Sequence, residues 1–271
     1  MPFAATWLTS PPGRVVGSFM AEMVESQTGA RTLAMADGRG LRVAVSPFLF
    51  RGMMVGMAGV AVGIHRTTGS TEMAWQFAKA RARNLCDLLG LDITVTGLEN
   101  LGGGGPFVYA PNHQSHLDIL TLLGFLPGRT RFATKQSLWR HAVVGAVLDT
   151  LGMIPIDREQ PELAIDHLNG RAGSNDSLVI FPEGTRSRDG RLGEFKKGAF
   201  VVAIALQRPI VPVICRGTRR LMPKGSRMAV VPGPIEIVVE KPISTLGLTY
   251  DDRNALSAQV RTAIERHHTG F

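Results

Sequence analysis

The sequence predicts an α/β fold, in which a single domain contains a mixed, largely parallel sheet flanked by helices. Two observations support this fold class. From residue 91 onward, short apolar segments typical of strands alternate with longer segments of helical periodicity, which is the pattern of parallel strands connected by helices. The chain has 271 residues, 44% hydrophobic and only 19% charged, so it can form a large core and does not resemble a disordered chain.

The charge of the chain points to an anionic partner. Lys and Arg number 30 and Asp and Glu number 22, which gives a formal net charge of +8. This charge favours nucleic acid, an anionic membrane surface or a phosphate-bearing substrate. Aromatic residues are only 6% of the chain, which argues against stacking on nucleic-acid bases. Cys86 and Cys215 have neither metal-site spacing nor a disulfide pattern, so a reducing compartment is expected.

The N-terminal part predicts a helical region that contacts a membrane. Residues 1–42 show no clear periodicity and no signal peptide, and they form an extension without an assigned role. Residues 43–64 are apolar but are interrupted by Pro47 and Arg51, and the rest is shorter than the roughly 20 residues that span a bilayer. The segment predicts a monotopic or re-entrant helix. A buried core helix and a tilted membrane span are the alternatives.

Two features extend this prediction to a membrane-associated helix pair over residues 43–90. The pairs Gly52/Gly56 and Gly59/Gly63 would allow close contact between helices. Residues 71–89 have the spacing of an amphipathic helix that Gly90 would cap. Its apolar positions are Met73, Phe77, Leu85, Leu88 and Leu89, and its basic face carries Lys79, Arg81 and Arg83. A solvated helix packed on the domain is the alternative to an interfacial one.

The first half of the α/β domain, residues 91–271, can be divided by changes of pattern. Residues 91–101 alternate between apolar and polar and predict a strand, and the continuous apolar run within 106–113 predicts a buried strand. The longer apolar segment at 116–126 predicts a helix. A short strand is expected within 130–138 and a helix over 141–152.

The second half continues the same alternation. Residues 153–157 predict a strand and 162–170 a helix. A buried strand that ends in a loop is expected within 177–187, followed by a helix at 198–207. The remaining expected elements are strands at 209–217 and 234–243 and a helix at 251–267.

The loop after the strand at 106–113 contains residues that can transfer a proton. In "NHQSHLD", His113 and Asp118 lie five positions apart across the start of a helix. An aspartate can orient a histidine ring and stabilise its protonated form, so that the free ring nitrogen accepts a proton from a hydroxyl. No Ser or Cys has a nucleophile-elbow context, so we expect the hydroxyl to belong to the substrate. His116 could instead join this pair as a metal ligand, but no second ligand motif follows, and we expect no metal.

Two further loops carry groups suited to phosphate. "GMIPIDRE" places Arg158 just after a strand, where it could bind phosphate in a bidentate manner or pair with a neighbouring carboxylate. In "FPEGTRS", Thr185, Arg186 and exposed backbone N–H groups could surround an oxyanion, and Glu183 could orient Arg186 or the substrate. Residues 186–227 hold 11 Lys/Arg and 2 Asp/Glu, a basic stretch that favours anionic substrate or lipid headgroups over a merely solvated face.

These loops together resemble four motifs of the lysophospholipid acyltransferase family, which acylates glycerol phosphates. "NHQSHLD" is similar to its N-H-x-x-x-x-D motif, "IPIDR" to its second motif, "FPEGTRS" to its third and "IVPVI" at 210–214 to its fourth. The order is that of the family, and the resemblance covers roughly residues 75–239. "FKKGAF" at 195–200 also looks like the family's segment between the third and fourth motifs.

The resemblance implies a role for each matching residue. His113 would be the general base and Asp118 its partner. Arg158, Glu183, Gly184, Thr185 and Arg186 would bind the acceptor, with both arginines on its phosphate. Lys135 lies where the family often has a lysine near that phosphate, and Pro212 would contribute to packing on the donor side.

The resemblance also implies an activity, 1-acylglycerol-3-phosphate O-acyltransferase. Such an enzyme moves a fatty acyl group from acyl-CoA or acyl-carrier protein to the free hydroxyl, giving phosphatidic acid without an acyl-enzyme or any cofactor. The expected partners are these substrates and an anionic membrane surface, not nucleic acid. The enzyme would be monotopic or peripheral, with its active site facing the cytoplasm. Three alternatives remain: another acceptor such as a lyso-ornithine lipid, a metal-dependent lipid or phosphoester hydrolase, and a catalytically silent lipid-binding module.

Overall fold

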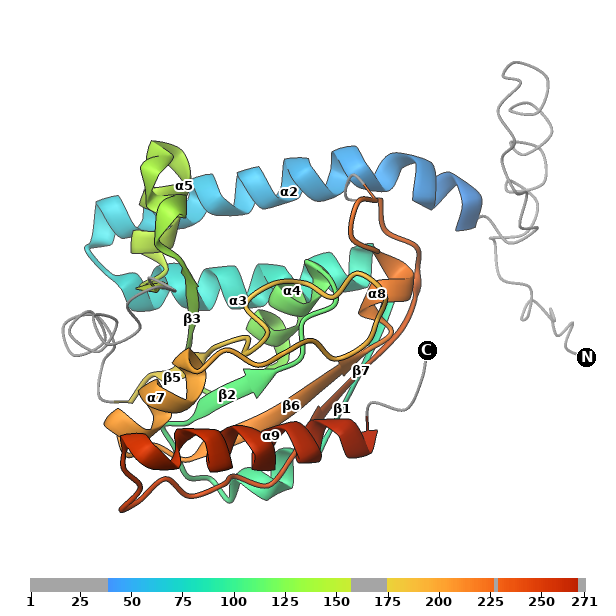
Figure 1. The fold of residues 1–271 in the computed structure, drawn as a ribbon. Coiled ribbons are helices and arrows are strands. Elements are labelled where there is room, and N and C mark those ends of the chain that lie inside the picture. The colour runs from blue at the N-terminus through green and yellow to red at the C-terminus, as the bar shows by residue number, and fades with distance from the viewer. Residues whose placement is uncertain (1–38, 157–174, 227–228, 268–271) are drawn as a thin grey trace, which may run out of the picture.

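A seven-stranded sheet lies at the centre of the part of the chain that the structure describes (Figure 1). The computed structural model describes residues 39–156, 175–226 and 229–267. Across the sheet, the strands follow the order β1 (Leu91–Thr96), β7 (Gly233–Val239), β6 (Ile210–Arg216), β2 (Val108–Pro111), β5 (Ser177–Val179), β3 (Thr130–Lys135) and β4 (Ile154–Ile156). Neighbouring strands are parallel except for β6 and β7, which confirms the predicted mixed, largely parallel sheet.

Some predictions fall on residues outside the described ranges. They concern most of the extension at 1–42, the helix at 162–170 and Arg158.

The burial of the strands explains their composition. β2 and β5 are buried at every position, because helices cover both faces and leave no solvated side. β1 alternates between buried and more exposed positions, as its sequence predicts. It ends before Gly97, which has φ of 80° and lies so close to β7 that a Cβ there would be 2.0 Å from the carbonyl oxygen of Val239. The predicted strand at 91–101 therefore stops at Thr96 and continues as a short 3-10 helix, η1 (Leu98–Leu101).

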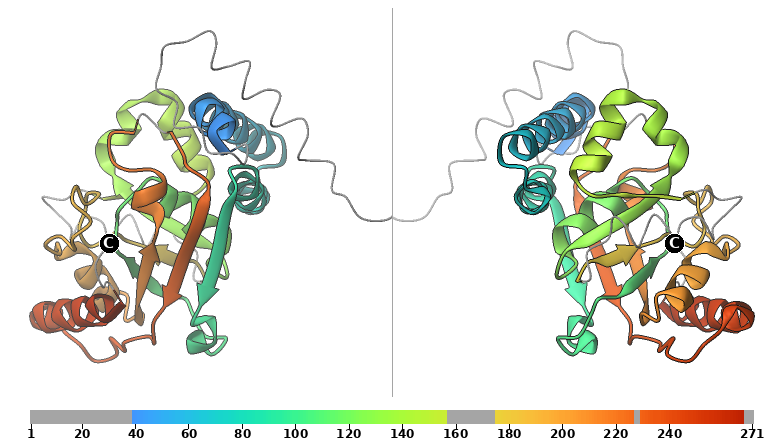
Figure 2. Two further views of the ribbon diagram at one scale, coloured as in Figure 1. Left: turned by 90° about the vertical axis from the view of Figure 1, so that its right-hand side faces the viewer. Right: turned by 90° about the vertical axis from the view of Figure 1, so that its left-hand side faces the viewer.

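Helices cover both faces of the sheet (Figures 1 and 2). One face packs against α3 (Thr71–Leu88) and α4 (Leu117–Phe125), and the other against α7 (Gly198–Ala205) and α9 (Arg253–His267). Successive strand residues point to opposite cores: Leu178 packs with α7 and α9, and Val179 packs with the α3 side. The remaining short elements are η2 (Gln136–Arg140), α8 (Thr218–Leu221) and η3 (Tyr250–Asp252).

The predicted helix at 43–64 is a longer, continuous helix, α2 (Arg39–Thr68), that forms an outer layer. It packs on α3 and on α5 (Ala142–Thr150) rather than on the sheet (Figure 1). Helix continues through Pro47 and Arg51, the two residues that interrupt the apolar run, because a proline removes only one backbone hydrogen bond. Among the described residues, no helix is long and apolar enough to cross a membrane.

The glycines of α2 face away from the rest of the protein. A Cβ added to Gly52, Gly56, Gly59 or Gly63 would meet no atom within 4 Å. The expectation that these residues permit close packing between helices is therefore not realised within this chain. Arg51 and Arg66 are exposed on α2, and so are the large apolar side chains Phe48, Val55 and Val60.

Helix α3 buries part of the stripe that its apolar positions predicted, since Leu85 and Leu89 are buried and Phe77 is partly buried. Met73 and Leu88 are exposed, whereas Ala74, Ala78 and Ala82 are buried. Small side chains on this stripe let α3 and α4 approach closely, and a Cβ on Gly124 of α4 would lie only 3.3 Å from the Arg83 side chain. The predicted cap is present, since the helix ends at Leu88 and Gly90 follows with φ of 67°.

The basic face of α3 is largely used inside the protein. Lys79 Nζ donates to the carbonyl oxygens of Leu126, at 2.6 Å, and Gly128, and Arg83 Nε donates to Gly124 O at 2.6 Å. These carbonyls lie at the C-terminal end of α4, where the helix dipole favours cations. Burial, and secondarily the charge of Arg83, lower the pKa of Lys79 to about 8. Two of the three predicted basic residues thus stabilise helix packing.

Candidate active site

Two of the three predicted functional loops, at 112–118 and 181–187, meet at one edge of the sheet. Strands β2, β5, β3 and β4 are mutually parallel neighbours, so their carboxyl ends lie on the same side. β2 leads into His113, β5 into the loop at 181–187, and β3 ends at Lys135. In open α/β sheets, ligands bind beyond this edge of the strands. Lys135 is exposed there, and Arg158 lies outside the described residues.

His113 and Asp118 form the pair that their spacing predicts. His113 Nδ1 is 2.9 Å from Asp118 Oδ2, and Asp118 is fully buried in the first turn of α4. The same oxygen accepts the backbone N–H groups of Gln114, at 2.6 Å, and Ser115, at 2.8 Å. Because Asp118 Oδ2 already accepts two backbone N–H groups, it serves as the acceptor for Nδ1–H, and this tautomer leaves a lone pair on Nε2. The histidine is set up to accept a proton at Nε2.

The ring of His113 is held from its face as well as from its edge. Phe181, the first residue of the predicted "FPEGTRS" loop, stacks on the imidazole with ring centroids 4.0 Å apart and planes inclined by 24°. The side chain of His113 is 12% exposed, so access to the ring is restricted. Packing and the Asp118 hydrogen bond together fix the orientation of the ring.

Asn112 is a structural residue that the sequence analysis did not single out. It is fully buried, its side-chain oxygen accepts the N–H of Cys215 at 2.7 Å, and its amide nitrogen donates to the carbonyl of Cys215 at 3.1 Å. These two bonds continue the pairing of β2 with β6 by one step after Pro111. An amide residue directly after a buried strand was the available signal. Its side chain sets the point at which the His113 loop leaves the sheet.

Glu183 contacts backbone groups on two loops. Its Oε1 accepts the N–H of His113 at 2.8 Å, and its Oε2 accepts the N–H of Gly193 at 2.9 Å. The residue is 5% exposed. We expected its carboxylate to orient Arg186 or the substrate. In the structure, both of its oxygens join the His113 loop to the segment that follows the third motif.

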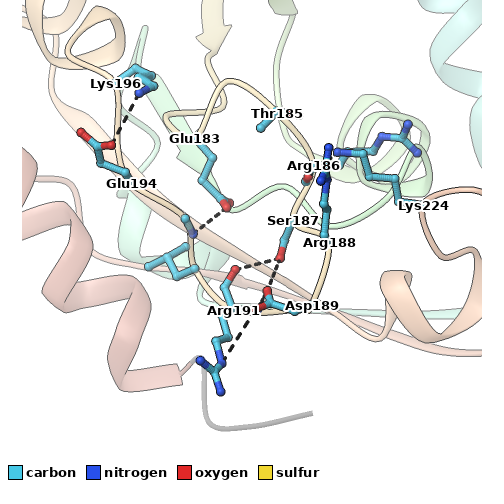
Figure 3. Close-up of a pocket in the computed structure, with 12 residues that line it drawn as sticks. Glu183, Thr185, Arg186, Ser187, Arg188, Asp189, Arg191, Glu194, Lys196 and Lys224 are labelled. Atoms are coloured by element: carbon cyan, nitrogen blue, oxygen red, sulfur yellow. Dashed lines mark hydrogen bonds and ion pairs between the residues drawn. The ribbon is translucent and has the colours of Figure 1, made fainter.

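The 181–196 segment surrounds the His113 loop and forms a pocket. Gly184 makes the predicted tight turn with φ of 65°. Ser187 N–H donates to His113 O at 2.8 Å, and Gln114 Nε2 donates to Gly190 O at 3.3 Å. A pocket of about 550 Å³ opens along this segment (Figure 3). It is lined by Glu183, Thr185, Arg186, Ser187, Arg188, Asp189, Arg191, Leu192, Gly193, Glu194, Lys196 and Lys224.

His116 stands at the start of α4 and is exposed. Desolvation of the ring, and then the positive charge of Arg186 and the neighbouring His113, lower the pKa of His116. A metal site would need His113, His116 and Asp118 as ligands, but Nδ1 of His113 and Oδ2 of Asp118 bind each other. The described residues contain no group of three or more His, Cys, Asp or Glu placed to hold a metal ion.

The basic stretch at 186–227 does not form a single face, contrary to the expectation. Arg208 donates to the carbonyl of Asp176, at the opposite edge of the sheet. Arg216 pairs with Glu236 at 2.8 Å. The stretch crosses the whole sheet along β6, so its cations are divided between the two edges. Pro212, from the predicted fourth motif, is buried in β6 opposite Ala110, consistent with a packing role.

Comparisons with known proteins show which proteins this chain is similar to. Residues 92–216 match the family described as Acyltransferase, and this range includes His113, Asp118, Glu183 and Arg186. The chain is 31% identical to the 1-acyl-sn-glycerol-3-phosphate acyltransferase alpha of Homo sapiens over 220 residues, which are 79% of this chain and 77% of the relative. It is 41% identical over 155 residues to the chloroplastic 1-acyl-sn-glycerol-3-phosphate acyltransferase BAT2 of Brassica napus, covering 55% of this chain and 44% of that relative.

The chain spans less than half the length of BAT2 and of the chloroplastic LPAT1 of Arabidopsis thaliana, which is covered over 43% of its length. The fold is similar to that of the 1-acyl-sn-glycerophosphate acyltransferase PlsC in its crystal structure from Thermotoga maritima. The TM-score is 0.67 at 24% sequence identity, over 86% of this chain and 99% of that one.

Proposed function

The chain belongs to the 1-acyl-sn-glycerol-3-phosphate acyltransferase family, and from this premise we propose that it acylates 1-acylglycerol-3-phosphate. The acyl group comes from a thioester, and the lipid product is phosphatidic acid. One observation carries the proposal: His113, paired with a buried aspartate, lies beside a basic pocket at the carboxyl edge of the sheet.

In the proposed first step, Nε2 of His113 accepts the proton of the acceptor's free hydroxyl. The alkoxide oxygen attacks the thioester carbonyl carbon and forms the new C–O bond, giving a tetrahedral intermediate. Asp118 stabilises the protonated imidazole through Nδ1, at 2.9 Å. Its own charge is held by the N–H groups of Gln114 and Ser115.

In the second step, the intermediate collapses and its C–S bond breaks. The thiolate leaves with the bonding electrons and receives the proton from Nε2, which returns His113 to its starting state. The acyl group passes directly from sulfur to oxygen, without an acyl-enzyme. The proposal uses acyl-CoA or acyl-carrier protein as co-substrate and no other cofactor.

The acceptor phosphate is proposed to bind near the turn at 184–186. Thr185 and Arg186 line the pocket, and Gly184 lets the backbone turn closely there. An arginine can donate two parallel hydrogen bonds to a phosphate. Lys135, at the end of β3, and Arg158, outside the described residues, complete the proposed set.

The enzyme is proposed to act at a membrane surface, as a monotopic or peripheral protein with its site on the cytoplasmic side. Support comes from α2, whose large exposed side chains include Phe48 at 81% and Val55 at 73% exposure. An apolar helix face of this kind can enter the interface between headgroups and acyl chains. The proposed acceptor and product are lipids, so this placement brings the site to its substrate.

The test is an acceptor and donor panel with a histidine variant. Purified protein in detergent should release CoA from palmitoyl-CoA when lysophosphatidate is present, and His113→Ala should lower the rate about 100- to 10,000-fold. His141→Ala is the matched control, because His141 is exposed at the start of α5 and, within the described ranges, makes no hydrogen bond to Asp118 or to a pocket residue. Near-normal turnover in His113→Ala would rule out the assigned base. Turnover with a lyso-ornithine lipid but not with lysophosphatidate would show that the proposed acceptor is wrong and that the lyso-ornithine lipid is the acceptor instead.

A further inference from the structure

The acidic residues of the pocket are already engaged. Asp189 accepts the Ser187 hydroxyl and the N–H of Arg191, whose guanidinium is 3.9 Å away. Glu194 pairs with Lys196 at 3.7 Å. Glu183 directs both oxygens to backbone N–H groups. The carboxylates of the lining thus have partners of their own.

Three cations of the lining have no carboxylate partner among the described residues. Among the described residues, no carboxylate lies within ion-pair distance of Arg186, Arg188 or Lys224. Figure 3 shows the three side chains gathered at one end of the pocket. Like charges repel, so this arrangement is unfavourable without an anion between or beside them.

Lys224 reaches this position from a distant part of the chain. It follows α8, in the connection between β6 and β7, and its Nζ donates to Arg186 O at 3.0 Å. Arg219, on α8, donates to Arg188 O at 3.2 Å. These bonds hold the 186–188 backbone and orient Lys224, whose ammonium group retains two further donors. Lys224 is therefore pre-organised, which lowers the cost of binding an anion.

We propose that this end of the pocket binds a phosphate group through Lys224 and Arg188, two residues outside the four sequence motifs. Arginine offers a planar pair of donors and lysine a compact positive charge, and both are common phosphate ligands. The volume of about 550 Å³ exceeds what a single phosphate fills, so the group belongs to a larger molecule.

Two substrates of the proposed reaction carry such a group. One is the phosphomonoester of lysophosphatidate, and the other is the nucleotide portion of CoA. Naming either lysophosphatidate or CoA as the molecule that carries the phosphate rests on the proposed function. The inference that the pocket binds a phosphate group does not rest on it. The experiment separates the two sources.

The kinetic test measures KM for each substrate at saturation of the other, in mixed micelles. Lys224→Ala and Arg188→Ala should each raise one KM about tenfold, because a charge-assisted hydrogen bond is lost, with kcat within about twofold. Lys224→Arg should restore most of the affinity. A rise in KM for lysophosphatidate that is absent with monoacylglycerol assigns the site to the acceptor. A rise for palmitoyl-CoA that is absent with S-palmitoyl-pantetheine assigns it to the donor.

The control is Lys241→Ala, which removes an exposed lysine near the opposite edge of the sheet and should change neither KM. If both KM values stay within twofold of wild type in Lys224→Ala and Arg188→Ala, the proposed site is overturned.

A second measurement needs no turnover. Inorganic pyrophosphate should raise the Tm of the wild-type protein and of Lys241→Ala, and the increase should be lost in Lys224→Ala. Equal increases in all three proteins would overturn the site. The two proposals can also fail separately. If pyrophosphate raises the Tm of the wild-type protein but not of Lys224→Ala, and the wild-type protein transfers no acyl group, the phosphate site is supported and the proposed function is not.

Discussion

At the scale of single residues, the His113 loop is held by partners far away in the chain. Asn112 bonds the backbone of Cys215, Gln114 bonds Gly190 O, and the hydroxyl of Ser115 donates to Met222 O at 2.7 Å. The loop therefore has little freedom to move away from Asp118. Rigid support of this kind keeps catalytic groups near their productive geometry.

Glu183 gives the clearest prediction at this scale. Glu183→Ala removes the acceptor for the N–H of His113 and should lower kcat about 100-fold, because small displacements of a catalytic group have effects of that size. KM for lysophosphatidate should stay within about threefold. Glu183→Gln keeps one amide oxygen as acceptor and should retain more activity than Glu183→Ala. Steady-state kinetics over both substrates check this outcome.

The control for this prediction is Glu99→Ala, since Glu99 is exposed on η1 and remote from the site in the chain. Its kinetic constants should equal those of wild type. A raised KM with unchanged kcat in Glu183→Ala would contradict the positioning role. It would instead support direct binding of the acceptor, as the resemblance to the family implied.

The pairing of His113 with Asp118 could be predicted from the sequence, because both residues lie on one loop and the following helix turn. The partners of that loop could not. Asn112 and Cys215 are 103 positions apart, and Glu183 is 70 positions from His113. No local periodicity reports such a contact. Lys224 had no local signal beyond its place in a basic stretch.

At the scale of elements, α3 shows where hydrophobicity alone misplaces part of a buried face. Of the five predicted apolar positions, Leu85 and Leu89 are buried and Phe77 is partly buried, yet Met73 and Leu88 are exposed. At the contact with α4, the small side chain of Ala82 allows a short distance between the helix axes, and its backbone lies 3.7 Å from where a Cβ on Gly124 would be. Lys79 and Arg83 border this contact and bond the end of α4. The face of α3 that packs against α4 therefore depends on how well the side chains fit together in size, as well as on their hydrophobicity.

This close packing predicts a specific loss of stability. Ala82→Leu places three extra carbons in the fully buried contact between α3 and α4 and should lower the free energy of unfolding by about 1–3 kcal/mol. Ala80→Leu makes the same change on the exposed side of α3 and should have almost no effect. Thermal unfolding of both variants checks this. Equal Tm values for the two would show that the α3–α4 contact is loose.

Helix α2 carries the prediction about membranes. Val55→Asp together with Val60→Asp places two charges on its exposed apolar surface and should weaken binding to anionic lipid vesicles at least about tenfold. Thr94→Asp, an exposed position on β1, is the control and should bind like wild type. Vesicle sedimentation measures both. If the α2 variant binds vesicles as tightly as the wild-type protein does, α2 is not the part of the protein that contacts the membrane.

At the scale of the whole molecule, the order of helices and strands from residue 91 onward could be predicted well from the sequence. Parallel strands covered on both faces need apolar residues at every position, and this leaves a strong pattern in β2, β5 and β6. The direction of β7 could not be predicted. Its pairing with β6 is antiparallel because the connection at 217–232 begins and ends at the same edge of the sheet. The alternation of apolar and polar residues in a strand is the same for either strand direction, so it does not predict this pairing.

The positive charge is likewise distributed by the fold rather than by the sequence order. Arg129 and Arg131 both pair with Asp176 at the amino edge of the strands, which Arg208 also reaches. The cations of the pocket, in contrast, lie near the carboxyl edge. A single count of net charge therefore combines residues that stabilise the domain with residues available to a ligand.

The long-range bonds of the His113 loop also set an order of events during synthesis. His113 and Asp118 leave the ribosome together, but Cys215 and Met222 emerge about a hundred residues later. Until then, the loop lacks two of its anchors, and the nascent chain carries the dyad without the support that orients it. The orientation that the proposed proton transfer needs is thus acquired late in translation, well after residues 39–88 have left the ribosome.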